Sequence, residues 1–137
     1  VFQQLEARDN RYSIQNTLTK VKQQADIAKS YGVDLMAYEG GQGLVDFKTK
    51  HDMEMPNPLL YQANRHPRME QFYNQFLNGW KQAGGTLFAH FSSPRTYRRY
   101  GSWGSKEYIT QPLSQAPKHR ALLNFNRRNP CWWQGCR

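Results

Sequence analysis

The fold is constrained most by short apolar runs that directly follow amphipathic helical stretches. Apolar residues recur at helical spacing over about residues 13–30, and Gly32 follows where a left-handed C-terminal cap is expected. The next run, about residues 33–38, is almost entirely apolar and predicts a strand with both faces covered. This segment therefore predicts a helix that leads into a buried strand.

The same order repeats later in the chain. A wide apolar stripe predicts a second helix over about residues 67–83, with Pro67 in its first turn and a glycine pair at its end. A short apolar run over 86–91 then predicts a second strand. Alternating helices and strands indicate an α/β fold whose strands are parallel and joined by right-handed crossovers.

A third helix is predicted near residues 114–125, whereas residues 40–66 are expected to form a long loop. Two parallel strands make a poor domain, because both outer edges would expose unpaired backbone groups. Either the N-terminal residues hide a further strand, or the chain is one segment of a larger sheet that other residues complete. We favour the second interpretation.

Chain length indicates one unit, residues 1–137, with residues 126–137 as a terminal extension. No run approaches the roughly 18 apolar residues of a membrane span, and the polar start does not resemble a signal peptide. The chain as given is expected to be soluble. It begins with Val1 rather than methionine, which fits either a processed mature protein or a piece of a longer one.

The chain carries a formal charge of +9, which favours anionic partners such as nucleic acid or acidic polysaccharide. Its positive residues are mostly dispersed. One dense group spans 95–100, with Arg127 and Arg128 as a second, smaller one. The simpler interpretation of both is a solvated loop and a helix end, so charge alone assigns no function.

Cys131 and Cys136 lie close together in the terminal extension, beside Trp132 and Trp133. We predict a local disulfide that stiffens this terminus, with the tryptophans covering it. A disulfide would place the protein in a secretory or periplasmic compartment. A metal site is not expected, because two thiols need further ligands and no second Cys/His cluster has suitable spacing, and we predict no cofactor.

Glu39 is the strongest candidate for an active-site acid. It ends the apolar run of the first predicted strand and precedes Gly40 and Gly41, which allow a sharp turn and leave room beside the side chain. The carboxyl ends of parallel strands are where chemistry usually occurs in such sheets. The alternative is a structural carboxylate that pairs with an arginine or accepts N–H groups of the turn.

Four segments together resemble the C-terminal part, strands seven and eight, of glycoside-hydrolase-like (β/α)8 barrels of the retaining-glycosidase clan. The resemblance spans about Ser13 to Phe125, and its order and spacing are more specific than any single motif. The segments are Ala37-Tyr38-Glu39-Gly40-Gly41-Gln42, the helix end 78–85, the strand 87–91 and Tyr100-Gly101-Ser102-Trp103-Gly104.

The resemblance implies a partial (β/α)8 TIM barrel completed by another chain or by a missing N-terminal segment. It implies that Glu39 occupies the nucleophile position at the end of strand seven. Retaining chemistry needs two carboxyl groups roughly 5–5.5 Å apart, and the acid/base glutamate of strand four has no counterpart in this sequence. Glu54 and Glu107 are expected in loops, and Glu70 is expected in the first helical turn for capping reasons.

Three further residues are candidate sugar ligands. Gln42 can either bind a hydroxyl group or close the turn, and His90 at the end of the second strand is either a ligand or a satisfied buried histidine. Trp103 suits stacking on a sugar face, with core packing as the alternative. Tyr38 should point away from Glu39 and is interpreted as a packing residue.

Three functions follow in order of preference. The first is a carbohydrate-active, glycoside-hydrolase-like protein whose Glu39 is a nucleophile or sugar-binding acid, secreted or extracellular, with a periplasmic location as the variant. Whether the chain is an enzyme stays open, because the second carboxylate is missing. The second is a non-catalytic glycan-binding or structural subunit of an extracellular assembly. A basic nucleic-acid-binding module using Arg95, Arg98 and Arg99 ranks last.

Overall fold

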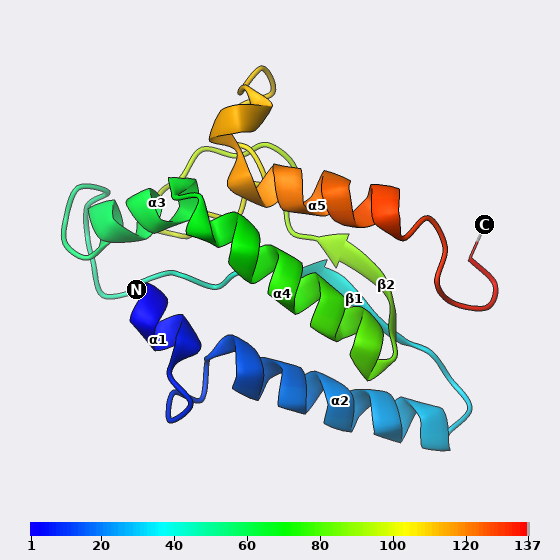
Figure 1. Cartoon of the computed structure of the whole chain (residues 1–137). Coiled ribbons are helices and arrows are strands. Elements are labelled where there is room, and N and C mark those ends of the chain that lie inside the picture. Colours follow the sequence, from blue (N-terminus) through cyan, green and yellow to red (C-terminus); the bar gives the residue numbers. More distant parts are fainter. Residues whose placement is uncertain (137) are drawn as a thin grey trace.

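A computed structural model describes residues 1–136, which form a mixed arrangement of helices and strands (Figure 1). This confirms the predicted α/β class. The elements in chain order are α1 (Phe2–Glu6), α2 (Ile14–Ser30), β1 (Leu35–Gly40), α3 (Asn57–Arg65), α4 (Arg68–Ala83), β2 (Gly85–His90), the 3₁₀ turn η1 (Leu113–Gln115) and α5 (Pro117–Arg128).

Local sequence signals account for the ends of the long helices. Ser13 caps α2, and its hydroxyl accepts a 3.3 Å hydrogen bond from the backbone N–H of Asn16. Gly32 takes the predicted left-handed conformation with φ 68°, and Gly84 does the same after α4 with φ 100°. Each glycine therefore ends a helix and turns the chain toward the strand that follows.

Within the described residues the sheet consists of β1 and β2, which pair in parallel. Leu35 lies opposite Gly85, Ala37 opposite Phe88, and Gly40 opposite His90. The register shifts on both sides of Ala37, so the pairing is irregular toward the carboxyl end of β1. The two strands therefore end side by side, with Gly40 and His90 at the shared edge.

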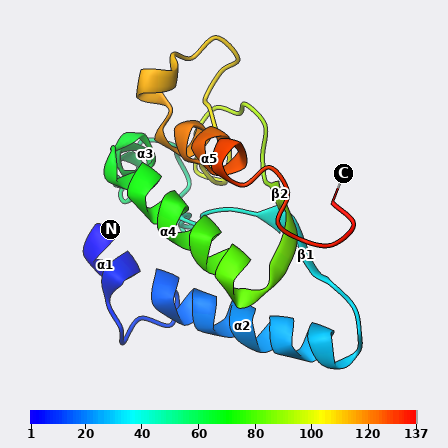
Figure 2. The same cartoon turned by 45° about the vertical axis from the view of Figure 1, so that its right-hand side comes forward.

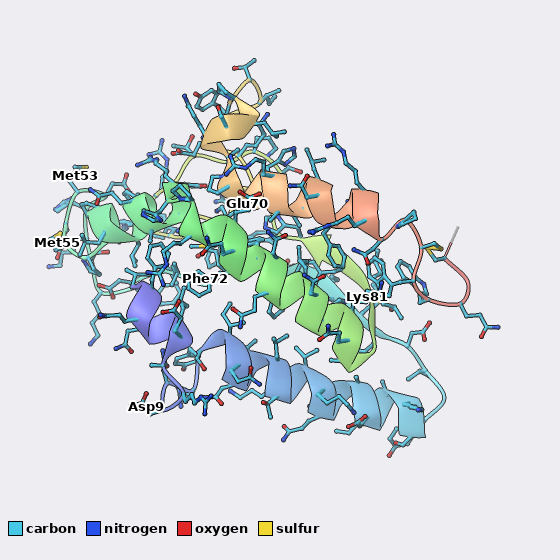
Figure 3. The ribbon with its side chains drawn as sticks, in the orientation of Figure 1. Asp9, Met53, Met55, Glu70, Phe72 and Lys81 are labelled. Atoms are coloured by element: carbon cyan, nitrogen blue, oxygen red, sulfur yellow. A yellow bond between two sulfur atoms is a disulfide. The ribbon has the colours of Figure 1, made fainter. Side chains whose placement is uncertain are left out.

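The helices lie on one side of this sheet (Figures 1 and 2). Helix α4 packs between α2 and α5 and also contacts β2. Its buried stripe includes Met69, Tyr73 and Leu77, and Met69 and Tyr73 form a cluster with Ala121 of α5. Phe72 points from α4 toward α1, where its ring stacks on Phe2 with centroids 5.5 Å apart (Figure 3).

The prediction that the first strand is covered on both faces is wrong. Met36 and Tyr38 of β1 are 53% and 77% exposed, and Leu87 of β2 is 46% exposed. Leu35 and Ala37 are half-buried, so burial alternates along β1 with the period of a strand covered on one side. Tyr38 is accordingly not a packing residue within the described chain.

The expected loop over 40–66 is also wrong in part, because Asn57–Arg65 form α3. Pro58 sits in the first turn of α3, where its missing N–H costs no helical hydrogen bond. The short α1 was not predicted either. The third predicted helix begins later than expected: η1 covers 113–115, and α5 starts at Pro117.

The terminal extension folds back onto the start of β2. Cys131 and Cys136 form the predicted disulfide. The indole N–H of Trp132 donates a 2.9 Å hydrogen bond to the carbonyl of Gly85, and its ring packs edge-on against Phe125 of α5. Trp132 thus covers the terminus, as expected. Among residues 1–136, no helix is both long enough and apolar enough to cross a membrane.

Candidate functional site

Glu39 lies near the carboxyl end of β1 with its side chain exposed. It follows the register shift after Ala37, which explains why both Tyr38 and Glu39 are exposed although neighbouring strand residues usually face opposite sides. Across the described residues, no salt bridge or side-chain hydrogen bond engages its carboxylate. The structure therefore shows no partner, among the described residues, for a structural role of the Glu39 carboxylate.

The glycines after Glu39 are required by close packing. A Cβ atom on Gly40 would lie 2.2 Å from the Phe88 ring, and one on Gly41 would lie 3.1 Å from the carbonyl oxygen of Phe91. Gly41 also has φ 156°, at the limit of the left-handed region. The Phe91 N–H donates a 2.8 Å hydrogen bond to the Gly40 carbonyl, which joins the two strand ends. The turn that presents Glu39 is therefore fixed to the end of β2.

A hydrogen-bonded chain from α4 supports this turn. The backbone N–H of Gln42 donates to the Tyr73 hydroxyl at 3.3 Å, and that oxygen lies 3.0 Å from Nε2 of His90. Burial lowers the pKa of His90 to about 4, assisted by the positive charge of Lys118. The ring is thus neutral at pH 7, so the Tyr73 hydroxyl can donate to Nε2 while accepting from Gln42. Burial likewise raises the pKa of Tyr73, which keeps the hydroxyl proton in place.

The side chain of Gln42 is committed to the turn. Its Nε2 donates a 2.7 Å hydrogen bond to the carbonyl of Ser102, and its Oε1 accepts a 2.8 Å hydrogen bond from the Leu44 N–H. Of the two roles that the sequence left open for Gln42, closing the turn is the one its contacts perform. Its use as a sugar ligand stays a prediction.

Trp103 follows Ser102 in the loop beyond β2 and is half-buried. Its indole N–H donates a 3.0 Å hydrogen bond to the Tyr100 carbonyl, and its ring lies 6.1 Å from that of Phe91 between centroids. Its backbone carbonyl accepts a 3.1 Å hydrogen bond from the N–H of Ser92. Trp103 is thus placed beside the residues that immediately follow β2, with part of its ring accessible.

The other glutamates all have structural partners. Glu107 forms a two-point ion pair with Arg65, at 2.8 and 2.6 Å, which raises the pKa of that arginine. Glu54 accepts a 2.7 Å hydrogen bond from the backbone N–H of Lys50. These contacts agree with the predicted loop positions of Glu54 and Glu107.

Glu70 lies in the first turn of α4, as expected, and its side-chain hydrogen bonds are with Arg120 rather than with the helix end. It points toward α5 (Figure 3) and accepts hydrogen bonds from Nε and Nη2 of Arg120, at 2.9 and 2.7 Å. Arg120 also donates to the carbonyls of Leu113 and Ser114. Glu70 therefore joins α4 to α5 and η1.

Lys118 is a buried polar residue that the sequence analysis missed. It lies in the first turn of α5 with no exposed surface. Its Nζ donates to Asn64 Oδ1 at 2.9 Å and to the carbonyl of Ser102, and it lies 4.5 Å from the centre of the Tyr97 ring. Burial lowers the pKa of Lys118 to about 7, opposed by the charge of Glu107. The signal for its burial was its spacing of three and seven residues before Ala121 and Phe125, on the same helix face.

The dense arginine group is partly neutralised. Arg98 lies 3.6 Å from the Asp52 carboxylate, and the backbone N–H of Arg99 donates to the same carboxylate at 2.7 Å. The guanidinium of Arg99 also donates to the carbonyl of Thr49 at 2.8 Å. These contacts fix the loop, and Arg95 and Arg98 stay exposed.

The structure therefore gathers the turn of Glu39 and Gln42, His90 and the Trp103 loop at the carboxyl ends of β1 and β2. The Glu39 turn and the Trp103 loop are joined by the hydrogen bond from Gln42 to Ser102, with Glu39 exposed and Trp103 half-buried. A carboxylate can bind hydroxyl groups of a polyhydroxylated ligand, and an indole can stack on its apolar face. Over residues 1–136, no cluster of three or more His, Cys, Asp or Glu side chains could hold a metal ion.

Comparisons with protein-family models, curated protein sequences and solved structures find no match for this chain.

Proposed function

We propose that this chain is a carbohydrate-active, glycoside-hydrolase-like protein in which Glu39 stands at the nucleophile position of a barrel rim. The observation that carries the proposal is an exposed carboxylate without a partner among the described residues, held by a rigid glycine turn at the carboxyl end of a parallel strand. In a retaining reaction, the Glu39 carboxylate would attack the anomeric carbon as the bond to the leaving oxygen breaks, and water would then hydrolyse the resulting ester.

We propose that further parallel strands, from another chain or an N-terminal segment, complete the sheet as a (β/α)8 barrel. Each strand of a two-stranded sheet has one edge without a strand partner. The face away from the helices exposes Met36, Tyr38 and Leu87, which are side chains that a closed barrel buries in its interior. The same strands would extend the rim around Glu39.

The proposed acid/base carboxylate also comes from outside these residues. Glu54, Glu70 and Glu107 are each held by other partners, so none is free to protonate a leaving group without losing a structural contact. The disulfide between Cys131 and Cys136 supports a secreted or extracellular location, because such bonds persist in oxidising compartments.

The second candidate is a non-catalytic glycan-binding or structural subunit of an extracellular assembly. Glu54, Glu70 and Glu107 all have structural partners, which favours the non-catalytic candidate. One carboxylate suffices for binding a glycan, whereas retaining hydrolysis needs two. The two candidates make the same prediction for sugar binding and opposite predictions for turnover.

Glu39→Gln in the full-length protein separates them, because it removes the nucleophile and keeps the size of the side chain. Hydrolysis of aryl glycosides that falls by at least about 10³-fold, with oligosaccharide binding retained, supports the enzyme. Binding without turnover in the natural protein supports the glycan-binding subunit. Natural turnover that survives the substitution excludes Glu39 as the nucleophile.

A further inference from the structure

One backbone oxygen receives hydrogen bonds from two distant parts of the chain. The carbonyl of Ser102 accepts from Nε2 of Gln42 at 2.7 Å and from Nζ of Lys118. Gln42 belongs to the turn after β1, and Lys118 belongs to the first turn of α5. Ser102 and Lys118 are both buried, at 1% and 0% exposure, so water does not replace the Lys118 donor, whereas Gln42 is half-buried.

Lys118 is held in place by groups from other elements. Asn64 of α3 accepts its second hydrogen bond at 2.9 Å, and Asn64 is itself anchored by donating to the Leu60 carbonyl at 2.9 Å. The Tyr97 ring lies 4.5 Å from the amine. A buried amine keeps such a position only when its donors are satisfied, which these partners accomplish.

The shared oxygen is adjacent to the candidate stacking residue. Ser102 immediately precedes Trp103, whose carbonyl accepts from the Ser92 N–H at 3.1 Å. The Ser105 N–H in turn donates to the Ser92 carbonyl at 3.0 Å. This loop is thus tied to the segment after β2 on one side and to the Glu39 turn, through Gln42, on the other.

We propose that Lys118 is a positioning residue of the candidate site: through the Ser102 carbonyl that it shares with Gln42, it holds the Trp103 loop against the Glu39 turn. Lys118 touches no ligand in this role and acts through Ser102. The identification of the ligand as a saccharide rests on the proposed function, whereas the mechanical link between Lys118, Ser102 and Gln42 does not.

NMR spectroscopy of the wild-type protein and of Lys118→Met tests the link without any ligand. Methionine keeps the apolar length of the lysine and removes its donors. The wild type should show couplings across hydrogen bonds from the Ser102 carbonyl carbon to both donor nitrogens. In Lys118→Met, the Gln42 side-chain amide, the Leu44 N–H and the Trp103 indole should shift, and the Leu44 N–H should exchange at least about 10-fold faster.

Lys106→Met is the matched control, because Lys106 also donates to a backbone carbonyl, that of Ile109 at 2.9 Å, in the segment after Trp103. It should leave the Gln42 and Leu44 signals unchanged. A folded Lys118→Met variant with unchanged Gln42, Leu44 and Trp103 signals overturns the proposal. If Lys118→Met does not fold, the wild-type couplings decide, and the absence of either coupling overturns it.

Titration with oligosaccharides, followed by the Trp103 indole signal, addresses the ligand separately. Weaker binding by about 10-fold in Lys118→Met, but not in Lys106→Met, is the expected result, and equal affinities of Lys118→Met and the wild type contradict a positioning role in the site. If the wild type itself binds no saccharide, the proposed function fails, while the ligand-free NMR result still decides whether Lys118 positions the loop.

Discussion

The Tyr73 hydroxyl lies 3.0 Å from Nε2 of His90 and also accepts a hydrogen bond from the backbone N–H of Gln42. A residue of α4 and a residue of β2 thereby support the turn that presents Glu39. Tyr73 is buried and His90 is half-buried, so exchanging this contact for solvent carries a cost.

Tyr73→Phe should lower the free energy of unfolding by about 1–3 kcal/mol, because it leaves the Gln42 N–H and the His90 nitrogen without their partner. Urea denaturation measures the loss. Tyr108→Phe is the control, since Tyr108 is 49% exposed and its hydroxyl is free to bond with water. Equal denaturation midpoints for the two variants would show that the Tyr73 contact does not hold the turn.

The free energy of unfolding should fall as the pH is lowered, because the folded state disfavours protonation of His90. Its pKa is about 4 in the folded chain against 6.5 ordinarily, so below pH 6.5 the unfolded state binds the proton more readily. The stabilisation is complete above pH 6.5 and is lost between pH 6.5 and about 4. His90→Gln should reduce the change in unfolding free energy across that window by on the order of 1–3 kcal/mol.

His51→Gln is the comparison for this measurement, because His51 has an exposed side chain. Urea denaturation at several pH values between 4 and 7 gives the three curves. Parallel curves for the wild type and His90→Gln would mean that His90 is not the group that titrates.

The same substitution should cost much more stability at Glu70 than at Glu39. Glu70→Gln weakens an ion pair with Arg120 that joins two helices, and should cost about 1–3 kcal/mol of unfolding free energy. Glu39→Gln changes an exposed carboxylate without such a partner, and should shift stability by less than about 0.5 kcal/mol. Thermal denaturation of both variants tests this contrast, and a large loss in Glu39→Gln would assign that residue a structural role.

The disulfide should contribute modestly to the free energy of unfolding. The bond between Cys131 and Cys136 closes a loop with a sequence separation of 5, for which chain entropy gives about 2 kcal/mol. Replacing both cysteines by serine should lower the unfolding free energy by about that amount. Because Trp132 also holds this segment through Gly85, the indole should remain half-buried in the variant. A fluorescence spectrum typical of fully exposed tryptophans would contradict this.

The sequence predicted the elements whose signals are local. Helix α4 has a continuous apolar stripe and ends at Gly84, and α2 ends where Gly32 adopts φ 68°. Helix α3 was missed because Pro56 and Pro58 read as loop residues, although a proline is also accommodated in a first helical turn. Helix α1 spans five residues, too short for a periodic pattern to be recognised.

Local sequence patterns do not show which elements cover a strand, or which distant residues contact a site. The apolar run containing Met36 indicates a strand with two covered faces, whereas within the described residues one face stays open. Gln42 and Ser102 are separated by 60 positions, and Lys118 was overlooked because a lysine usually marks a helix surface. The position of Glu39 at a strand end was predictable from the glycines that follow it.

Covalent trapping of Glu39 tests the proposed function most directly. A 2-deoxy-2-fluoro glycoside with a dinitrophenolate leaving group needs no protonation by an acid, so the missing acid/base carboxylate does not obscure the result. We predict that the full-length protein gains the mass of one fluoroglycosyl group and that peptide mapping places the ester on Glu39, with no labelling in Glu39→Gln. A label on another carboxylate, or turnover of the glycoside without dependence on Glu39, would contradict the account.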